Sequence, residues 1–81
     1  MLEVKQSELD LLILGKAFRE IREQHGLGAG ELATATGVDG VRIAALEEGR
    51  LDADYDLLLT LAEGIGVRAS AFFLRAEELG S

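Results

Sequence analysis

Few residues of this 81-residue chain have side chains suited to catalysis or metal binding. His25 is the only histidine and there is no cysteine, so a metal site would have to be built from carboxylates alone. No Ser-His-Asp set and no carboxylate pair stands out at a spacing typical of acid and base catalysis. The serines and threonines fit helix caps or helix surfaces. We therefore expect no enzyme activity, no metal site and no cofactor, with His25 a solvated residue in the last turn of a helix.

The charge balance limits which partners the chain can bind. Fifteen Asp and Glu residues against eight Lys and Arg residues give a net charge of −7. A phosphate backbone repels such a chain unless the basic residues gather on one face. No apolar run approaches the roughly 18 residues that span a bilayer, and the N-terminus lacks the basic start of a signal peptide. Without cysteines for disulfides, these features favour a cytoplasmic protein with no membrane contact.

Apolar residues spaced three and four apart, and separated by glycines, predict the helices that would position any site. The first should begin at about Glu8, after a capping pair of Ser7 and Asp10, and end at Gly26. Four more are expected between Gly28 and Gly37, between Asp39 and Gly49, between Asp54 and Gly66, and from Ser70 into the acidic pair Glu77-Glu78, with Asp39, Asp54 and Ser70 as the expected N-caps. The sequence therefore predicts an all-α fold of five helices without a strand.

Several short motifs occur in order along residues 14–73. They are Leu14-Gly15, Phe18-Arg19, Ile21-Arg22, Gly26-Leu27, Glu31-Leu32-Ala33, Gly37-Val38, Ile43, Leu46-Glu47, Gly49, Leu58, Leu61-Ala62, Ile65-Gly66-Val67 and Phe72-Phe73. In this order and spacing the chain resembles the Cro and lambda-repressor (XRE-type) family of helix-turn-helix domains. The resemblance implies a five-helix, lambda-repressor-like domain at residues 14–75. An N-terminal arm or helix extension would precede it at residues 1–13, and an acidic tail would follow at residues 76–81.

The resemblance also implies an ion pair between Arg22 of the first helix and Glu47 of the third. The alternative, that both are solvated surface charges, would apply to any arginine and glutamate. If the pair is buried, Glu47→Ala should destabilise the fold by about 3 to 5 kcal/mol. Phe72 and Phe73 are expected to close the core.

In the resembled family the third helix enters the major groove of double-stranded DNA and the start of the second holds a phosphate. Carried over position by position, this assigns DNA contact to Gly28, Ala29, Gly40, Val41, Arg42, Ala44 and Ala45, with Arg50 beside them. Alanine and valine offer only a methyl contact to thymine, so Arg42 alone of the groove-facing set can make a directional contact. Arg42 and Arg50 are the only nearby cations, and the nearby carboxylates outnumber them. These carboxylates belong to Asp39, Glu48, Asp52, Asp54 and Asp56.

Two functions therefore stay open. The resemblance favours a small transcriptional regulator that binds operator DNA. The small apolar face around Val41 and the acidic surroundings favour a helix-turn-helix that serves as a protein-protein interaction module without specific DNA binding, because small residues allow close packing. A third possibility is that this face is simply exposed to solvent.

Apolar residues near the N-terminus exceed what one face of a first helix can bury. They are Leu2, Val4, Leu9, Leu11, Leu12 and Ile13. We expect this part either to lengthen the first helix and cover a protein partner, or to pair with its copy in a homodimer. Deleting residues Met1 to Gln6 should then lower the apparent mass in solution.

Overall fold

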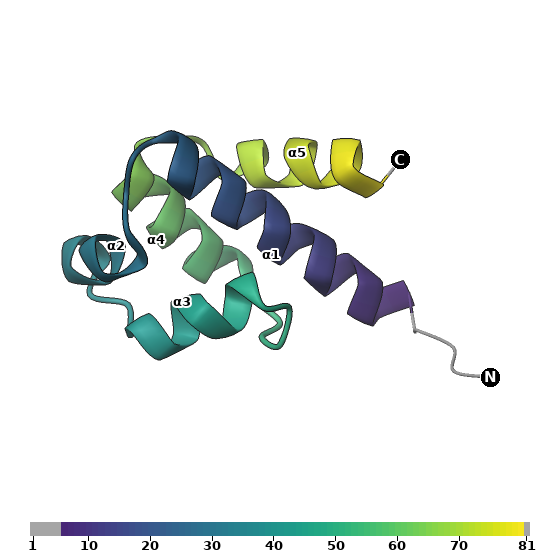
Figure 1. Cartoon of the computed structure of the whole chain (residues 1–81), viewed down its shortest axis with the longest axis horizontal. Helices are drawn as coiled ribbons and strands as arrows, with labels where there is room; N and C mark the ends of the chain where they lie inside the picture. Colours follow the sequence, from purple (N-terminus) through teal and green to yellow (C-terminus); the bar gives the residue numbers. More distant parts are fainter. Residues whose placement is uncertain (1–5, 81) are drawn as a thin grey trace.

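The computed structural model describes the backbone of residues 6–80 and the side chains of residues 10–80. Within that range the chain forms helices and no strand. The helices are α1 (Gln6–Gln24), α2 (Ala29–Thr36), α3 (Gly40–Glu47), α4 (Tyr55–Ile65) and α5 (Ser70–Gly80) (Figure 1). The prediction of an all-α, five-helix fold is confirmed. α1 is the longest helix, with α5 packed along it and α2 packed against both α3 and α4.

Helix starts and ends in the middle of the chain follow the chemistry expected from the sequence. Asp39 caps α3 by accepting the N–H of Val41 at 2.9 Å, and Asp54 caps α4 by accepting the N–H of Leu57 at 2.8 Å. The residues that follow α2 and α4 are glycines in the left-handed conformation, with φ of +77° at Gly37 and +94° at Gly66. Local sequence therefore fixes where these helices stop.

The first and last described helices are longer than the sequence predicted. α1 begins at Gln6, so Ser7 lies inside the helix and not at its cap. Ser70 is likewise already helical, and α5 continues through the acidic residues to Gly80. The end of α5 is tied to α1, because Arg75 donates from Nε to Glu20 Oε2 at 2.7 Å. Helices cross both expected domain boundaries without a break, and the division at residues 13 and 75 stays a prediction; residues 1–5 lie outside the described range.

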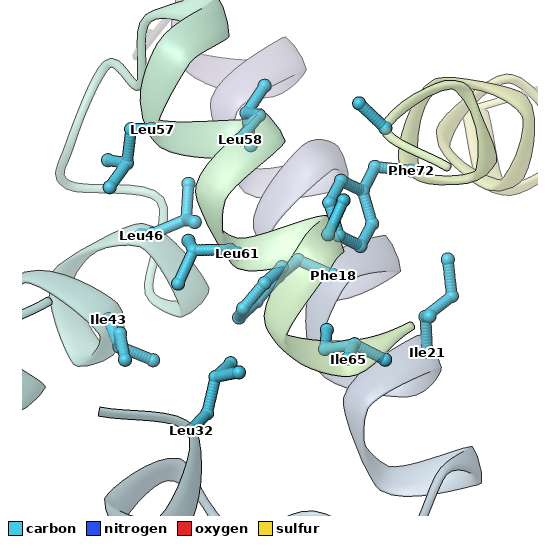
Figure 2. Close-up of a cluster of buried hydrophobic side chains, with 12 residues drawn as sticks. Phe18, Ile21, Leu32, Ile43, Leu46, Leu57, Leu58, Leu61, Ile65 and Phe72 are labelled. Carbon is cyan, nitrogen blue, oxygen red and sulfur yellow. The ribbon is translucent and has the colours of Figure 1, made fainter. Parts of the chain in front are cut away.

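The hydrophobic core joins all five helices around two phenylalanines. Phe18 of α1 and Phe72 of α5 are fully buried, with ring centroids 5.2 Å apart in an edge-to-face arrangement (Figure 2). The other fully buried large side chains are Leu32, Ile43, Leu46, Leu58 and Leu61. The expectation that Phe73 also closes the core is wrong, because it lies one helical step from Phe72 and is 42% exposed.

Candidate nucleic-acid interface

The turn between α2 and α3 is fixed by local hydrogen bonds and one apolar contact. Thr36 donates from its hydroxyl to the carbonyl of Leu32 at 2.8 Å and accepts the N–H of Val38 at 3.2 Å. Val38 is half-buried and packs against the core. Thr36 was expected only as helix surface or a cap, although a threonine before a helix-ending glycine is a signal for such a turn. This turn sets the position of α3 relative to α2.

α3 is attached to α1 by a buried ion pair. Arg22 Nε donates to Glu47 Oε2 at 2.7 Å and Arg22 Nη2 donates to Glu47 Oε1 at 2.8 Å, while Nη1 donates to the carbonyl of Leu27 at 2.8 Å. Each of the two charged side chains is only 10% exposed. The hydrogen bonds to Glu47 raise the pKa of the Arg22 guanidinium against the opposing effect of burial. The resulting pair is bidentate, and it fixes the C-terminal end of α3.

A close backbone contact supports the same attachment. A Cβ atom at Gly15 of α1 would collide with the carbonyl oxygen of Leu46 and lie 2.9 Å from that of Glu47. Because both obstacles are backbone atoms at the end of α3, they cannot move aside as a flexible side chain could. Only glycine at position 15 allows α1 and α3 to approach this closely.

The outer face of α3 carries most of the residues that the sequence assigned to DNA contact. Gly40, Val41 and Arg42 are exposed, and Ala45 is half-buried. A Cβ atom placed on Gly40 would lie 4.0 Å from Cβ of Ala33, so the start of α3 lies against α2. Figure 1 shows α2 and α3 side by side at one end of the molecule. The assigned residues of α3 therefore share one accessible surface next to α2.

The start of α2 is only partly accessible. Gly28 is exposed, whereas Ala29 is half-buried and packs against the core. The N–H of Gly28 donates to Glu31 Oε1 at 3.0 Å. Glu31 therefore occupies a backbone N–H that could otherwise bind a phosphate at this helix start.

The starts of α3 and α4 are closed in the same way. Asp39 accepts the N–H of Val41, and Asp54 accepts the N–H of Leu57. In each case a carboxylate of the chain itself takes the place of an external anion at the helix start. The caps at Asp39 and Asp54 agree with the prediction from the sequence, whereas the role of Glu31 at the start of α2 was not predicted.

The two arginines assigned to this surface differ in their surroundings. Arg50 donates from Nε to Glu48 Oε2 at 2.7 Å, and both side chains are exposed. Among residues 10–80, Arg42 makes no ion pair within 4.0 Å. Its side chain lines a shallow pocket of about 270 Å³ together with Asp54 and Asp56. Arg42 is thus the available cation of the surface, with two carboxylates close by.

Other kinds of site have little support in the described part of the chain. Among those residues no group of three or more His, Cys, Asp or Glu side chains could hold a metal ion. No single described helix is long and apolar enough to cross a membrane; α4 and α5 together reach that length and apolarity, but they meet at a bend of 101°. The surface formed by α2 and α3 is therefore the candidate site.

Five helices with a short, fixed turn between α2 and an exposed α3 define a helix-turn-helix domain of the lambda-repressor type. The sequence profile of a helix-turn-helix domain family matches residues 13–71, which is most of the chain. The chain belongs to this family. The fold and family implied by the sequence motifs are therefore confirmed.

Solved structures of bacterial regulators share the fold over nearly their whole length. The clp gene regulator ClgR from C. glutamicum is 26% identical, with a TM-score of 0.84 over 89% of this chain and 94% of ClgR. The restriction-modification controller protein C.AhdI from Aeromonas hydrophila is 28% identical, with a TM-score of 0.77 over 80% of this chain and 98% of C.AhdI. The chain is similar in size and arrangement to both.

A more distant match supports the fold alone. An HTH_3 family transcriptional regulator from Vibrio cholerae is 23% identical, with a TM-score of 0.81 over 91% of this chain. Only 42% of that regulator is covered, so this chain corresponds to one part of the longer protein. A search of curated proteins finds no significant match.

Proposed function

We propose that this protein is a DNA-binding transcriptional regulator that places α3 in the major groove of double-stranded DNA. The observation that carries the proposal is the exposed outer face of α3, held against α2 by a fixed turn and against α1 by the Arg22–Glu47 pair. Helix-turn-helix proteins use this geometry to bring the first turns of the second helix of the motif to base edges. The similarity to ClgR and C.AhdI, both named as regulators, supports the same role.

The surface predicts modest affinity. Arg42 is the one long polar side chain among the assigned groove-facing residues of α3, and the starts of α2, α3 and α4 are capped by carboxylates. Few phosphates can therefore be neutralised by each copy of the chain, and non-specific binding depends on such neutralisation. The regulator should consequently bind random DNA poorly and depend on a matched operator.

A salt titration with mixed-sequence duplex DNA tests the function. Binding at low salt should be in the micromolar range and should weaken as salt rises, since each neutralised phosphate contributes about −0.9 to the slope of log K against log salt. Arg42→Ala should reduce both the affinity and the magnitude of the slope. Arg68 is an exposed arginine between α4 and α5, and Arg68→Ala should leave the affinity and the slope nearly unchanged. If no duplex binds even at low salt, the protein-protein interaction module becomes the better description.

We also propose that the regulator acts as a homodimer in the cytoplasm. Large apolar side chains are exposed on α4, at Tyr55 and Leu59, and on α5, at Phe73 and Leu74; we call the surface around Tyr55 and Phe73 the α4–α5 patch. Tyr55 and Phe73 line one groove of about 350 Å³, whose walls also include Leu11 and Leu14 of α1. A second copy covering this patch would bury apolar surface and pair two α3 helices for two half-sites. Pairing would also double the few DNA contacts that each copy offers.

A further inference from the structure

Val41 occupies the centre of the outer face of α3. Successive residues of a helix are turned by about 100°, and Ile43 and Leu46 point into the core with no exposed surface. The side chain of Val41 therefore points to the opposite side of the helix from those of Ile43 and Leu46. Its side chain is 73% exposed, which is the largest exposure of any large apolar side chain in the described part of the chain.

The neighbours of Val41 on that face cannot add polar contacts. Ala44 and Ala45 flank it on either side and carry only methyl groups. Arg42 lies one helical step away, toward α4, where it lines the shallow pocket with Asp54 and Asp56. The centre of the face therefore offers methyl groups, and the guanidinium lies to one side of it.

An apolar centre limits what it can contact in a major groove. A base edge with donors or acceptors would lose water against Val41 and gain no hydrogen bond in return. The apolar group that the major groove presents is the methyl on C5 of a pyrimidine, and apolar side chains contact it. Thymine carries this methyl, and so does 5-methylcytosine, at the same position.

We propose that Val41 is a specificity-determining residue that recognises the C5 methyl group of a pyrimidine in the operator. The proposal rests on the proposed function and deepens it, because it names the feature of DNA that this face selects. Specificity then comes from a methyl contact at the centre of α3, and Arg42 adds a polar contact at its side. Burial of one methyl group changes affinity about four-fold, so two half-sites change it by about an order of magnitude.

The test begins with a random-sequence duplex library from which bound DNA is selected, and the enriched duplex is then synthesised with deoxyuridine in place of single thymines. Uracil differs from thymine only by the absent methyl. At one position of a half-site, this single replacement should weaken binding by the wild-type protein about four-fold, and the same replacement in both half-sites should weaken it by about an order of magnitude. A duplex with cytosine at that position should bind better when the cytosine carries a C5 methyl, which separates recognition of the methyl from recognition of thymine.

Two variants connect the effect to the side chain. Val41→Ala removes the two methyl groups that valine projects farthest from the helix, so the difference in affinity between the thymine and uracil duplexes should fall well below four-fold. The exposed position and the helix propensity of alanine keep the fold intact. Glu63→Gln, at an exposed site near the C-terminal end of α4, should keep the four-fold difference. Equal binding of thymine and uracil duplexes by the wild-type protein would overturn the methyl proposal alone. Failure to enrich any duplex would overturn it together with the proposed function.

Discussion

Arg22 and Glu47 lie 25 positions apart in the chain and form a bidentate pair, with two hydrogen bonds of 2.7 and 2.8 Å between their side chains. The pair lies at the junction of α1 and α3, where each side chain is 10% exposed. The third donor group of Arg22 bonds to the carbonyl of Leu27, in the loop that leads to α2. One arginine of α1 therefore holds both the end of α3 and the loop that leads to α2.

Glu47→Ala should destabilise the protein by about 3 kcal/mol, because it leaves the buried charge of Arg22 without its partner. The free energy of unfolding from urea denaturation measures the effect. The adjacent glutamate provides the control: Glu48 pairs with Arg50 in solvent, so Glu48→Ala should cost under about 1 kcal/mol. Equal losses for the two variants would mean that the Arg22–Glu47 pair contributes no more than a surface pair.

Glycine substitutions should separate the close contact between α1 and α3 from ordinary helix propensity. Gly15→Ala should cost about 1 to 3 kcal/mol or more, because the added methyl group meets the carbonyl oxygens of Leu46 and Glu47. Gly30→Ala has no atom within 4 Å of the new methyl group and lies inside α2, so it should stabilise the fold by about 0.5 to 1 kcal/mol. Thermal melts of both variants show opposite shifts if this is correct. A rise in melting temperature for Gly15→Ala would contradict the close contact.

The parts of the fold that could be predicted from sequence depend on local chemistry. Asp39 and Asp54 cap helices, and Gly37 and Gly66 end them, through bonds and dihedral angles that involve only nearby residues. The family motifs add the long-range information, since no periodicity could show that Arg22 faces Glu47. That pairing was expected only because the motifs containing the two residues resemble a known family.

The features that sequence analysis missed depend on tertiary packing. The full length of α5 is supported by the bond from Arg75 to Glu20 of α1, a residue 55 positions away. Phe73 is exposed because the rotation of α5 is set by Phe72 against Phe18. At the candidate interface, the assignment of Gly28, Ala29 and the residues of α3 to DNA contact stays a prediction, although the structure places the assigned α3 residues on one surface.

Asp56→Asn should strengthen DNA binding about two-fold at low salt. Asp56 lines the same pocket as Arg42, so its charge opposes both the arginine's attraction for DNA and the approach of a phosphate. The helix bond from Thr60 uses the backbone carbonyl of Asp56, so it survives the substitution. Fluorescence anisotropy with a labelled duplex measures affinity, and the gain should shrink as salt screens the charges. Glu77→Gln on α5 makes the same change in net charge and should have little effect; equal gains would show that only net charge matters.

Phe73→Ser should weaken homodimer formation about ten-fold or more, if the α4–α5 patch is the surface that pairs two copies. Phe73 presents a partly exposed ring beside Tyr55 in a common groove, and aromatic anchors of this kind dominate interface energies. Analytical ultracentrifugation over a concentration series measures the dissociation constant.

Leu74→Ser changes a more exposed neighbour on α5 and should act in the same direction with less risk to the fold. Urea denaturation checks that both variants stay folded. Val41→Ser replaces an even more exposed apolar residue on α3 and should leave dimerisation unchanged, because that face is needed for DNA. A wild-type protein that stays monomeric at high concentration would contradict the proposed homodimer. Loss of dimerisation in Val41→Ser alone would place the interface on α3 instead of the α4–α5 patch, and it would contradict the proposed role of α3 in DNA binding.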